Sequence, residues 1–317
     1  MTITVGVVMD PISLITPKKD TTLAMLLAVQ RRGWEIRYLE LSGITLRDGQ
    51  PYACSQALVV RDSLDDWYEF VGEKTTHAMA ELDVILMRKD PPFDTEYIYA
   101  TYILEQAQMR GCLVVNDPRS LRDANEKLFT AWFAEVCPST LVTRDPAEIK
   151  RFLQEFGDII VKPLDGMGGA SIFRVTAGDS NASVIYETLT NHASRFCMAQ
   201  QYIPEIKDGD KRILMIDGEP VPYALARVPS AGELRGNLAA GGVGRGQALS
   251  ERDREICATV GPELKRRGLI FVGLDVIGNY LTEINVTSPT CMRELEAQFD
   301  VQIADQLMEC IAEHLEQ

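Results

Sequence analysis

Short apolar runs alternate with amphipathic segments over the first third of the chain. Four of these runs have the length of one buried strand and lie at residues 3–9, 35–39, 84–87 and 113–115. Asp20 precedes an apolar-periodic segment that ends before Gly33, as in a capped helix. Thr95 stands in the same position before a segment that ends at Gly111. Because such alternation is typical of a parallel sheet with helices on both faces, we expect a three-layer α/β domain over residues 1–122.

The pattern changes after a boundary at Asn116-Asp117-Pro118. Asp217-Gly218 is typical of a two-residue turn between two strands. Helices are expected at 121–134, 181–192, 250–267 and 301–315. Strands are expected at 159–162, 171–175, 197–202, 211–216, 221–227, 269–277 and 281–286. This mixture predicts an α+β region.

Composition narrows the range of functions. The chain has 317 residues, of which 46% are hydrophobic, and it can bury the cores of about two domains. Its formal net charge of −14 argues against a nucleic acid or an anionic membrane as partner, because both require a basic surface. Seven scattered cysteines without a C-x-x-C pair indicate free thiols in a reducing compartment. Neither a signal peptide nor an apolar stretch long enough to span a bilayer is seen, so the cytoplasm is expected.

The segment DIIVKPLDGMGGASIFRV, residues 158–175, is typical of a strand, a lysine, a glycine-rich turn and a second strand. Gly166, Gly168 and Gly169 let backbone N–H groups approach a ligand closely. Lys162 adds a positive charge at the edge of this anion cradle, for which a nucleotide triphosphate is the expected ligand. A β-hairpin with a surface lysine explains the same residues equally well. The first strand leads to no G-x-G-x-x-G fingerprint, and the chain has no Walker A motif.

A second glycine-rich segment, residues 228–246, is long for a connection inside a compact domain. It has glycines at positions 232, 236, 241, 242, 244 and 246. Two interpretations are open. One is a flexible surface insertion. The other is a lid over a ligand, which Arg235 and Arg245 inside the segment and Arg227 beside it favour.

Asp275, Glu283 and Asn285 form another polar group. Glu283 and Asn285 are two apart on an expected strand and therefore share a face. If Gly278-Asn279 were a plain two-residue turn, Asp275 on the preceding strand would face the opposite side from Glu283. A magnesium site made by the three side chains therefore requires an odd-length turn or a β-bulge. A hairpin with polar side chains facing solvent is the alternative.

Together these features resemble bacterial glutathione synthetases of the ATP-grasp superfamily. The resemblance covers essentially the whole chain and rests on the strings MDPI, MRKDPPFDTEYIYATYILE, NDPRSLRDANEKLFTAWF, KPLDGMGGASIFRV, IKDGDKR, RGNLAAGG and LTEINVTSPT. It implies that the α/β domain over 1–122 is followed by a two-subdomain ATP-grasp fold, with subdomains at 123–203 and 204–317. It also implies an ATP-dependent ligase that joins γ-glutamylcysteine to glycine, giving glutathione, ADP and phosphate. A homotetramer is implied by the resemblance alone.

The resemblance further implies a nucleotide site. Lys127 and Lys162 are expected at the phosphates or the adenine, with Gly166–Gly169 over the phosphates. The residues expected at adenine and ribose are Gln200, Gln201, Tyr202, Ile203 and Asp210. Mg²⁺, or Mn²⁺ in its place, is expected on Asp275, Glu283 and Asn285.

Amide formation from a carboxylate requires activation, because the carboxylate oxygen is a poor leaving group. Phosphoryl transfer from ATP would give an acyl phosphate, which the glycine amine then attacks, and the protein positions the groups and neutralises charge. We expect Arg227 nearest the transferred phosphoryl group, Arg212 as its support, and Arg235 in a lid that excludes water. The residues expected at the substrates are Lys18, Arg88, Lys89, Asn237, Ser288 and Arg293. Of these, Lys18, Arg88, Lys89 and Arg293 are expected at the substrate carboxylates, and Asn237 in the lid with Arg235. Solvated charges or ion pairs explain Lys18 and Lys89 equally well.

Two other functions remain open. One is a different ATP-grasp ligase, such as a D-alanine–D-alanine or glutamate-adding enzyme, which the N-terminal strings and the glycine-rich segment would distinguish. The other is a nucleotide-binding regulatory protein, which predicts the loss of a lysine or a metal ligand, and none is lost. Cys291 lies beside the expected site, but the reaction needs no protein thiol, and we interpret it as packing.

Overall fold

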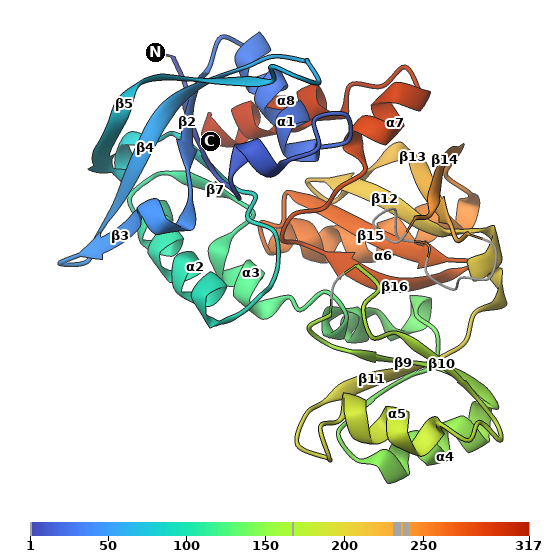
Figure 1. Ribbon diagram of the computed structural model, residues 1–317. Helices are drawn as coiled ribbons and strands as arrows, with labels where there is room; N and C mark the ends of the chain where they lie inside the picture. The colour runs from blue at the N-terminus through green and yellow to red at the C-terminus, as the bar shows by residue number, and fades with distance from the viewer. Residues whose placement is uncertain (1, 167, 231–235, 237–240, 317) are drawn as a thin grey trace.

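The computed structural model describes residues 2–166, 168–230, 236 and 241–316, and they form three β-sheets with helices packed against them (Figure 1). The first sheet has the strand order β3-β4-β2-β1-β6-β7, with β5 paired to β4. Its strands are β1 (Thr4–Val8), β2 (Glu35–Leu39), β3 (Ile44–Arg47), β4 (Gln50–Val60), β5 (Tyr68–Ala78), β6 (Val84–Met87) and β7 (Leu113–Val115). β2, β1, β6 and β7 run parallel, and they are the four strands that the apolar runs predict.

The other three strands of this sheet are missing from the sequence-based prediction. β3, β4 and β5 extend the sheet from β2 in antiparallel pairing, so the sheet is mixed rather than wholly parallel. Most of β5 is exposed. β5 therefore has no buried face and no apolar alternation that would reveal it, whereas β4 alternates buried and half-buried positions and is missing from the prediction all the same. The expectation of a parallel sheet is right for its centre and wrong for this edge.

Helices cover both faces of the first sheet (Figure 1). α1 (Thr21–Arg31) and α8 (Ile303–Leu315) lie on one face, and α2 (Thr95–Gln108) and α3 (Pro118–Asp123) lie on the other. Asp20 caps α1 as expected, accepting a hydrogen bond from the Leu23 amide at 2.6 Å. α2 is capped by Asp94 rather than by Thr95, so the expected cap was one residue late. The three layers of the α/β prediction are confirmed.

The second sheet is antiparallel, and α4 (Pro146–Phe156) and α5 (Ala182–Leu189) cover the face that is turned away from the rest of the molecule (Figure 1). Its strands, in spatial order, are β10 (Phe173–Thr176), β9 (Asp158–Pro163), β11 (Cys197–Gln201) and β8 (Thr140–Thr143). Its core includes Ile149, Val161 and Tyr186. The glycine-rich turn connects β9 to β10, as the sequence predicts.

The helix expected at 121–134 is interrupted. α3 ends at Asp123, and a 3₁₀ segment follows at Leu128–Val136. In the gap, Asn125 Oδ1 accepts hydrogen bonds from the amides of Lys127 at 3.1 Å and Leu128 at 2.9 Å. Because such a side chain offers backbone donors an alternative to the helix, the chain turns here. Shorter 3₁₀ segments occur at Ile12–Leu14, Leu41–Gly43, Met79–Glu81 and Pro204–Asp208.

The third sheet has the order β14-β13-β12-β15-β16 and packs against α6 (Glu251–Arg266) and α7 (Met292–Gln298). Its strands are β12 (Asp210–Ile216), β13 (Glu219–Val228), β14 (Val243–Ala248), β15 (Phe271–Ile277) and β16 (Tyr280–Asn285). The two-residue turn at Asp217-Gly218 is confirmed, since Ile216 pairs with Glu219. The segment 228–246 is not a loop throughout, because β14 begins at Val243 and pairs with β13.

The β15–β16 hairpin combines a two-residue turn with a β-bulge. Ile277 pairs with Tyr280 around the turn, and the register then shifts so that Asp275 pairs with Glu283. Thr282 is the extra residue, and its hydroxyl donates to the Asp275 carbonyl at 3.1 Å. The bulge that a shared face for Asp275 and Glu283 requires is therefore present.

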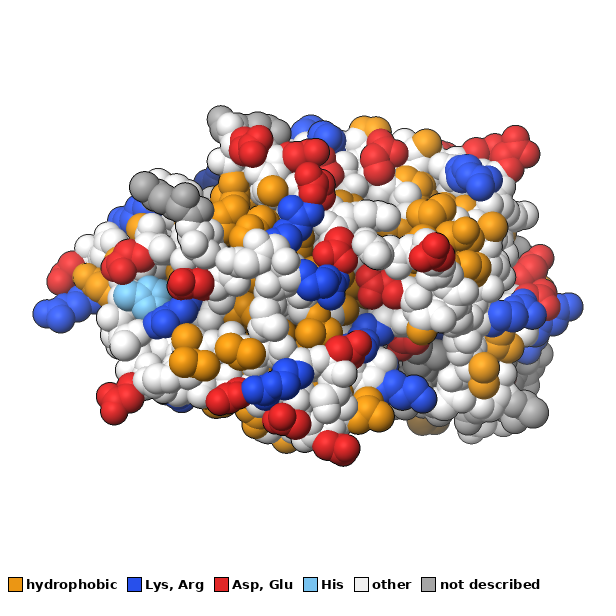
Figure 2. Space-filling model, turned by 90° about the horizontal axis from the view of Figure 1, so that it is seen from above, with side chains coloured by type: hydrophobic (Ala, Val, Ile, Leu, Met, Phe, Trp, Pro, Cys, Tyr) orange, Lys and Arg blue, Asp and Glu red, His pale blue; other side chains and the backbone are white. Residues whose placement is uncertain are grey.

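The face seen from above carries acidic and basic side chains interspersed with apolar ones (Figure 2). Within the described ranges, no helix is both long and apolar enough to cross a membrane. The expectations that the protein binds neither nucleic acid nor membrane stay predictions, as does the cytoplasmic location.

Candidate active site

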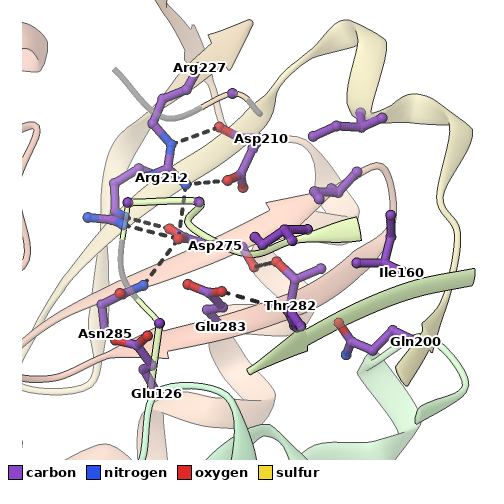
Figure 3. Close-up of a pocket in the computed structure, with 18 of the residues that line it drawn as sticks. Glu126, Ile160, Gln200, Asp210, Arg212, Arg227, Asp275, Thr282, Glu283 and Asn285 are labelled. Carbon is purple, nitrogen blue, oxygen red and sulfur yellow. Dashed lines mark hydrogen bonds and ion pairs between the residues drawn. The ribbon is translucent and has the colours of Figure 1, made fainter. Parts of the chain in front are cut away.

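A cleft lies between the second and third sheets (Figure 3). Residues of the second sheet and its glycine-rich turn that line it are Ile160, Lys162, Gly166, Gly168, Gly169, Gln200, Gln201 and Tyr202. From the third sheet come Asp210, Arg212, Arg227, Asp275, Glu283 and Asn285. Asp90, after β6, and Ser288, after β16, also reach it. The cleft therefore gathers residues that the sequence analysis expected at phosphates, metal and adenine.

Two arginines hold Asp275 at the floor of the cleft. The register of β12 and β15 sets Arg212 directly opposite Asp275. Arg212 donates from Nε to Oδ1 at 2.5 Å and from Nη2 to Oδ2 at 3.0 Å. Arg227 Nη2 lies 2.9 Å from the same Oδ2. Burial works to raise the pKa of Asp275, but the charges of Arg212 and Arg227 outweigh it and hold that pKa below its usual range.

Asp210 is the second partner of Arg227, whose Nη2 donates to Asp210 Oδ2 at 2.5 Å (Figure 3). Burial raises the pKa of Asp210 to about 6, the Arg227 charge opposes this, and Asp275 and Glu283 add to it. Asp210 Oδ1 is buried and has no hydrogen-bond partner among the described residues. A buried acceptor without a donor is costly unless a ligand supplies one.

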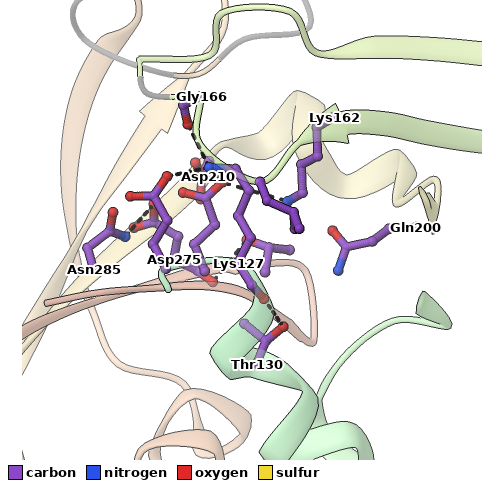
Figure 4. Close-up of polar contacts among 12 residues, drawn as sticks. Lys127, Thr130, Lys162, Gly166, Gln200, Asp210, Asp275 and Asn285 are labelled. Carbon is purple, nitrogen blue, oxygen red and sulfur yellow. Dashed lines mark hydrogen bonds and ion pairs between the residues drawn. The ribbon is translucent and has the colours of Figure 1, made fainter. Parts of the chain in front are cut away.

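The side chains of Lys127, which precedes the 3₁₀ segment at Leu128–Val136, and of Lys162, on β9, extend toward the same region of the cleft (Figure 4). Lys127 Nζ donates to the Gly166 carbonyl at 2.6 Å and to the Glu126 carboxylate. Both ammonium groups are near Glu283 Oε1, with Nζ at 3.7 Å for Lys127 and 3.6 Å for Lys162. Burial lowers the pKa of Lys162, opposed by Glu283. For Lys127 the effect of burial is outweighed by Glu283 and Glu126, so that pKa is raised.

The far end of the cleft is apolar and suits a flat ring. It is lined by Ile160, Ile172, Ile203, Ile206 and Ile277. Beside them, the Arg174 guanidinium lies 3.8 Å from the centroid of the Tyr202 ring and pairs with Asp158. Gln200 donates from its side chain to Thr140 Oγ1 at 3.0 Å. Sequence reasoning did not single out Arg174, although it lies in one of the strings that carry the resemblance.

The acidic side chains of the cleft fit a divalent cation. Asn285 Nδ2 donates to Asp275 Oδ2 at 3.2 Å, so its Oδ1 remains available as a ligand (Figure 3). Glu126, which sequence reasoning missed, also lines the cleft. Burial and then the charge of Glu283 raise the pKa of Glu126. Carboxylates that repel one another and an amide oxygen form the hard oxygen donor set that Mg²⁺ prefers.

The residues expected at the substrates are not gathered in one place. Ser288 lines the cleft, and its hydroxyl donates to Asp90 Oδ1 at 2.6 Å. Arg88 is buried and donates to Thr22 Oγ1 at 3.1 Å and to the Pro289 carbonyl at 3.0 Å. Arg88 does not line the described cleft. Neither do Lys18, which is exposed, Lys89, which pairs with Asp10 at 3.0 Å, or Arg293, which pairs with Asp62 at 2.5 Å. Arg235 and Asn237 lie outside the described residues.

Comparison with known families agrees with this geometry. Residues 3–122 match the model of the prokaryotic glutathione synthetase N-terminal domain, and residues 126–300 match that of the prokaryotic glutathione synthetase ATP-grasp domain. The chain belongs to the prokaryotic glutathione synthetase family. It is 61% identical over 315 residues to a glutathione synthetase of Escherichia coli O127:H6, covering 99% of both chains. It is 60% identical over 316 residues to one from Vibrio vulnificus, covering 100% of this chain and 99% of the relative.

Solved structures of lower identity share the fold. A D-cycloserine synthetase superposes with a TM-score of 0.69 at 16% identity, over 98% of this chain and 99% of that chain. The ATP-grasp ligase PsnB superposes with a TM-score of 0.65 at 18% identity, over 99% of this chain and 98% of that chain. At such identities the likeness speaks for the ATP-grasp fold alone.

Membership of the glutathione synthetase family confirms the expected ATP-grasp fold and an ATP-dependent ligase that forms glutathione. Because the match includes the N-terminal domain, it favours this function over another ATP-grasp ligase and over a regulatory protein. The domain boundaries at 122 and 203, the roles of individual site residues, the metal and the homotetramer stay predictions.

Proposed function

We propose that the cleft carries out glutathione synthesis in two steps. The cysteinyl carboxylate of γ-glutamylcysteine attacks the γ-phosphorus of ATP, giving an acyl phosphate and ADP. The glycine amine then attacks the acyl carbon, phosphate leaves, and glutathione is formed. The single observation that carries this proposal is the set of four buried cations, Lys127, Lys162, Arg212 and Arg227, gathered on one acidic cleft.

The nucleotide would lie along the cleft, with its base in the apolar end. Gln200 and Gln201 end β11, Tyr202 and Ile203 follow it, and these four residues would hold adenine. The ribose hydroxyls would donate to Asp210, whose Oδ1 lacks a partner among the described residues. Lys127 and Lys162, with Gly166, Gly168 and Gly169 above them, would hold the phosphates.

Asp275, Glu283 and Asn285 would hold Mg²⁺, or Mn²⁺ in its place. Glu126 is near enough to Glu283 for the Glu283 charge to raise its pKa, and it would add a further carboxylate to the site. When bound, this cation neutralises phosphate charge and aligns the transferred phosphoryl group. The protein's part is to keep Asp275 ionised, which Arg212 and Arg227 do.

Arg227 would stabilise the charge on the transferred phosphoryl group, with Arg212 as its support. Both guanidiniums are buried and fixed by carboxylates, so they need little reorganisation during the reaction. We keep Arg235 and Asn237 as lid residues that would exclude water from the acyl phosphate.

The substrate carboxylates would contact Arg88 and Ser288, with Lys18, Lys89 and Arg293 farther out. Arg88 supports this best. In the described part of the chain, no carboxylate lies within 4.0 Å of its buried guanidinium, and a bound substrate carboxylate would supply the missing negative partner. Changing Arg88 to alanine should raise KM for the peptide, and unchanged kinetics would reject its assignment.

The test of the whole proposal is phosphate release from ATP and Mg²⁺ with γ-glutamylcysteine, with and without glycine. Release is expected with both substrates. Hydroxylamine in place of glycine should trap the acyl phosphate as a hydroxamate. No release above background with both substrates present would reject the ligase. Sedimentation at working concentration would test the homotetramer separately.

A further inference from the structure

Three metal-ligating side chains meet outside the cleft, between the β12–β13 turn and the last turns of α8. They are Asp217, Cys310 and His314. One carboxylate oxygen, the thiol sulfur and one imidazole nitrogen all lie within 4.8 Å of one another, and all three residues are half-buried. No step of the proposed reaction uses them.

The scaffold holds these side chains in place. Cys310 and His314 are four residues apart on α8 and therefore share a face of the helix. Asp217 lies in the tight turn, and its amide donates to the Ile270 carbonyl at 2.8 Å. The next residue, Gly218, packs so closely on Gly261 of α6 that a Cβ there would meet the Gly261 carbonyl at 2.7 Å. α8 in turn contacts β12, so the ligand set comes from two elements that already pack together.

The distances fit a small tetrahedral ion. His314 Nε2 and Asp217 Oδ1 are 3.5 Å apart. Two ligands at about 2.0–2.2 Å from a tetrahedral zinc ion are separated by roughly 3.3–3.6 Å. Lys265 Nζ lies 2.5 Å from the other carboxylate oxygen, Oδ2. This ion pair orients the Asp217 carboxylate and leaves Oδ1 facing the imidazole, as an outer-shell partner does in a metal site.

We propose that Asp217, Cys310 and His314 bind one Zn²⁺ ion, with water as the fourth ligand. A set of one sulfur, one nitrogen and one oxygen donor suits Zn²⁺ and is a poor match for Mg²⁺, which prefers oxygen. α8 packs on α1, which covers the first sheet, and it also contacts β12 of the third sheet, so the ion would reinforce the contact between these two parts. An ion that binds only the folded chain stabilises it by mass action.

The experiment uses the full chain, stripped of metal and titrated with Zn²⁺ or with Co²⁺ in excess Mg²⁺. Co²⁺ serves as the spectroscopic probe because a cobalt–thiolate bond gives a charge-transfer absorption in the near ultraviolet. We expect one ion per chain with this absorption, and a rise of the Tm by a few degrees on adding Zn²⁺. Cys310→Ser should abolish the absorption. Loss of an outer-shell partner typically weakens metal binding by roughly 10- to 100-fold. His314→Gln removes a direct ligand, so it should weaken Zn²⁺ binding by at least that much.

Cys54→Ser is the matched control, because Cys54 is another half-buried thiol, located on β4 far from the three ligands in sequence. It should keep the absorption and the rise in Tm. Absence of the thiolate absorption in the unmodified chain, or its persistence in Cys310→Ser, would overturn the proposal. If His314→Gln does not fold, Cys310→Ser decides, since it exchanges a single atom. Cation binding at the active-site carboxylates gives no thiolate absorption and does not imitate the result.

Discussion

At the scale of single residues, the cleft is organised by shared partners. Asp275 accepts from Arg212, Arg227 and Asn285, and Arg227 in turn also contacts Asp210. Removing one member of such a buried network leaves the others with an uncompensated charge, which is more costly than the loss of the pair itself. Each substitution here therefore changes the charge state of its neighbours as well as one contact.

Arg227→Met should lower kcat by about 10²–10³, the range found when a preorganised transition-state donor is removed. KM for ATP should change less, because the Arg227 guanidinium acts on charge that develops only during phosphoryl transfer. Arg227→Lys keeps the charge but not the two-partner geometry, and a smaller loss is expected. Steady-state kinetics measures this, with Arg174→Met as the control that should raise KM for ATP instead. A kcat within twofold of the unmodified chain in Arg227→Met would contradict the assignment.

Asp210 should make ATP binding depend on pH. Its pKa of about 6 lies above the ordinary aspartate value of 3.8, so it is ionised only above about pH 6. Below that pH it loses its charge-assisted bond with Arg227, and kcat/KM for ATP should fall. The effect on folding has the opposite sign. A raised carboxyl pKa stabilises the folded state fully below the unfolded pKa, and this contribution is lost as pH rises through about 6. In Asp210→Asn the kcat/KM profile should lack that step; an unchanged profile would assign it to another group.

At the scale of elements, the β15–β16 hairpin decides which side chains can meet. Its turn is the plain two-residue kind, and one extra residue, Thr282, restores the shared face of Asp275 and Glu283. Without the bulge, every residue from Glu283 onward would change faces, since side chains alternate along a strand.

Deleting Thr282 removes the extra residue and leaves Asp275 paired with Glu283 in a plain hairpin, so much of the activity and the Mg²⁺ dependence should remain. Thr282→Val is the matched control, because it keeps the bulge and loses only the hydroxyl bond to the Asp275 carbonyl. Thr282→Val should lower the free energy of unfolding by about 1 kcal/mol and keep most of the activity. Circular dichroism checks folding, and Mg²⁺ titration of activity checks the site. Loss of Mg²⁺ dependence in a folded deletion variant would refute the register argument.

At the scale of the whole molecule, Asn116 joins the first and third sheets. Its Nδ2 donates to the carbonyls of Phe271 at 2.8 Å and Val286 at 2.7 Å, and its Oδ1 accepts from the Phe271 amide at 2.8 Å. These residues flank β15 and β16, which carry the acidic side chains of the cleft. One side chain thus helps to fix how these two strands sit against the N-terminal domain.

Asn116→Ala should lower the free energy of unfolding by about 3 kcal/mol, because three buried backbone groups lose their partner. Urea unfolding measures it. Asn279→Ala, in the exposed β15–β16 turn, is the control and should have little effect. A loss at Asn116 no larger than at Asn279 would mean that the joint contributes nothing.

Much of this architecture follows from sequence patterns, and the exceptions have physical reasons. Apolar runs locate β2, β6 and β7 because those strands are buried, whereas β5 escapes because it is exposed. The strings that contain Lys162, Asp210 and Glu283 predict residues of the cleft. Glu126 and Arg174 are missed because a local pattern does not reveal partners that only tertiary contacts bring close. The roles of the residues expected at the substrates stay predictions, because these residues come from separate segments of the chain that do not gather in the described cleft.

The return of α8 to the first sheet has a consequence for biogenesis. α8 packs on α1, and Arg31 pairs with Asp305 at 2.6 Å, so one layer of the N-terminal domain is supplied from the other end of the chain. During translation α1 emerges long before α8, and its apolar face stays uncovered in the meantime. A nascent chain in this condition is a natural client for chaperones that bind exposed apolar surface. This layer of the domain is therefore completed only after α8 has been synthesised, even though most of the domain's residues are synthesised first.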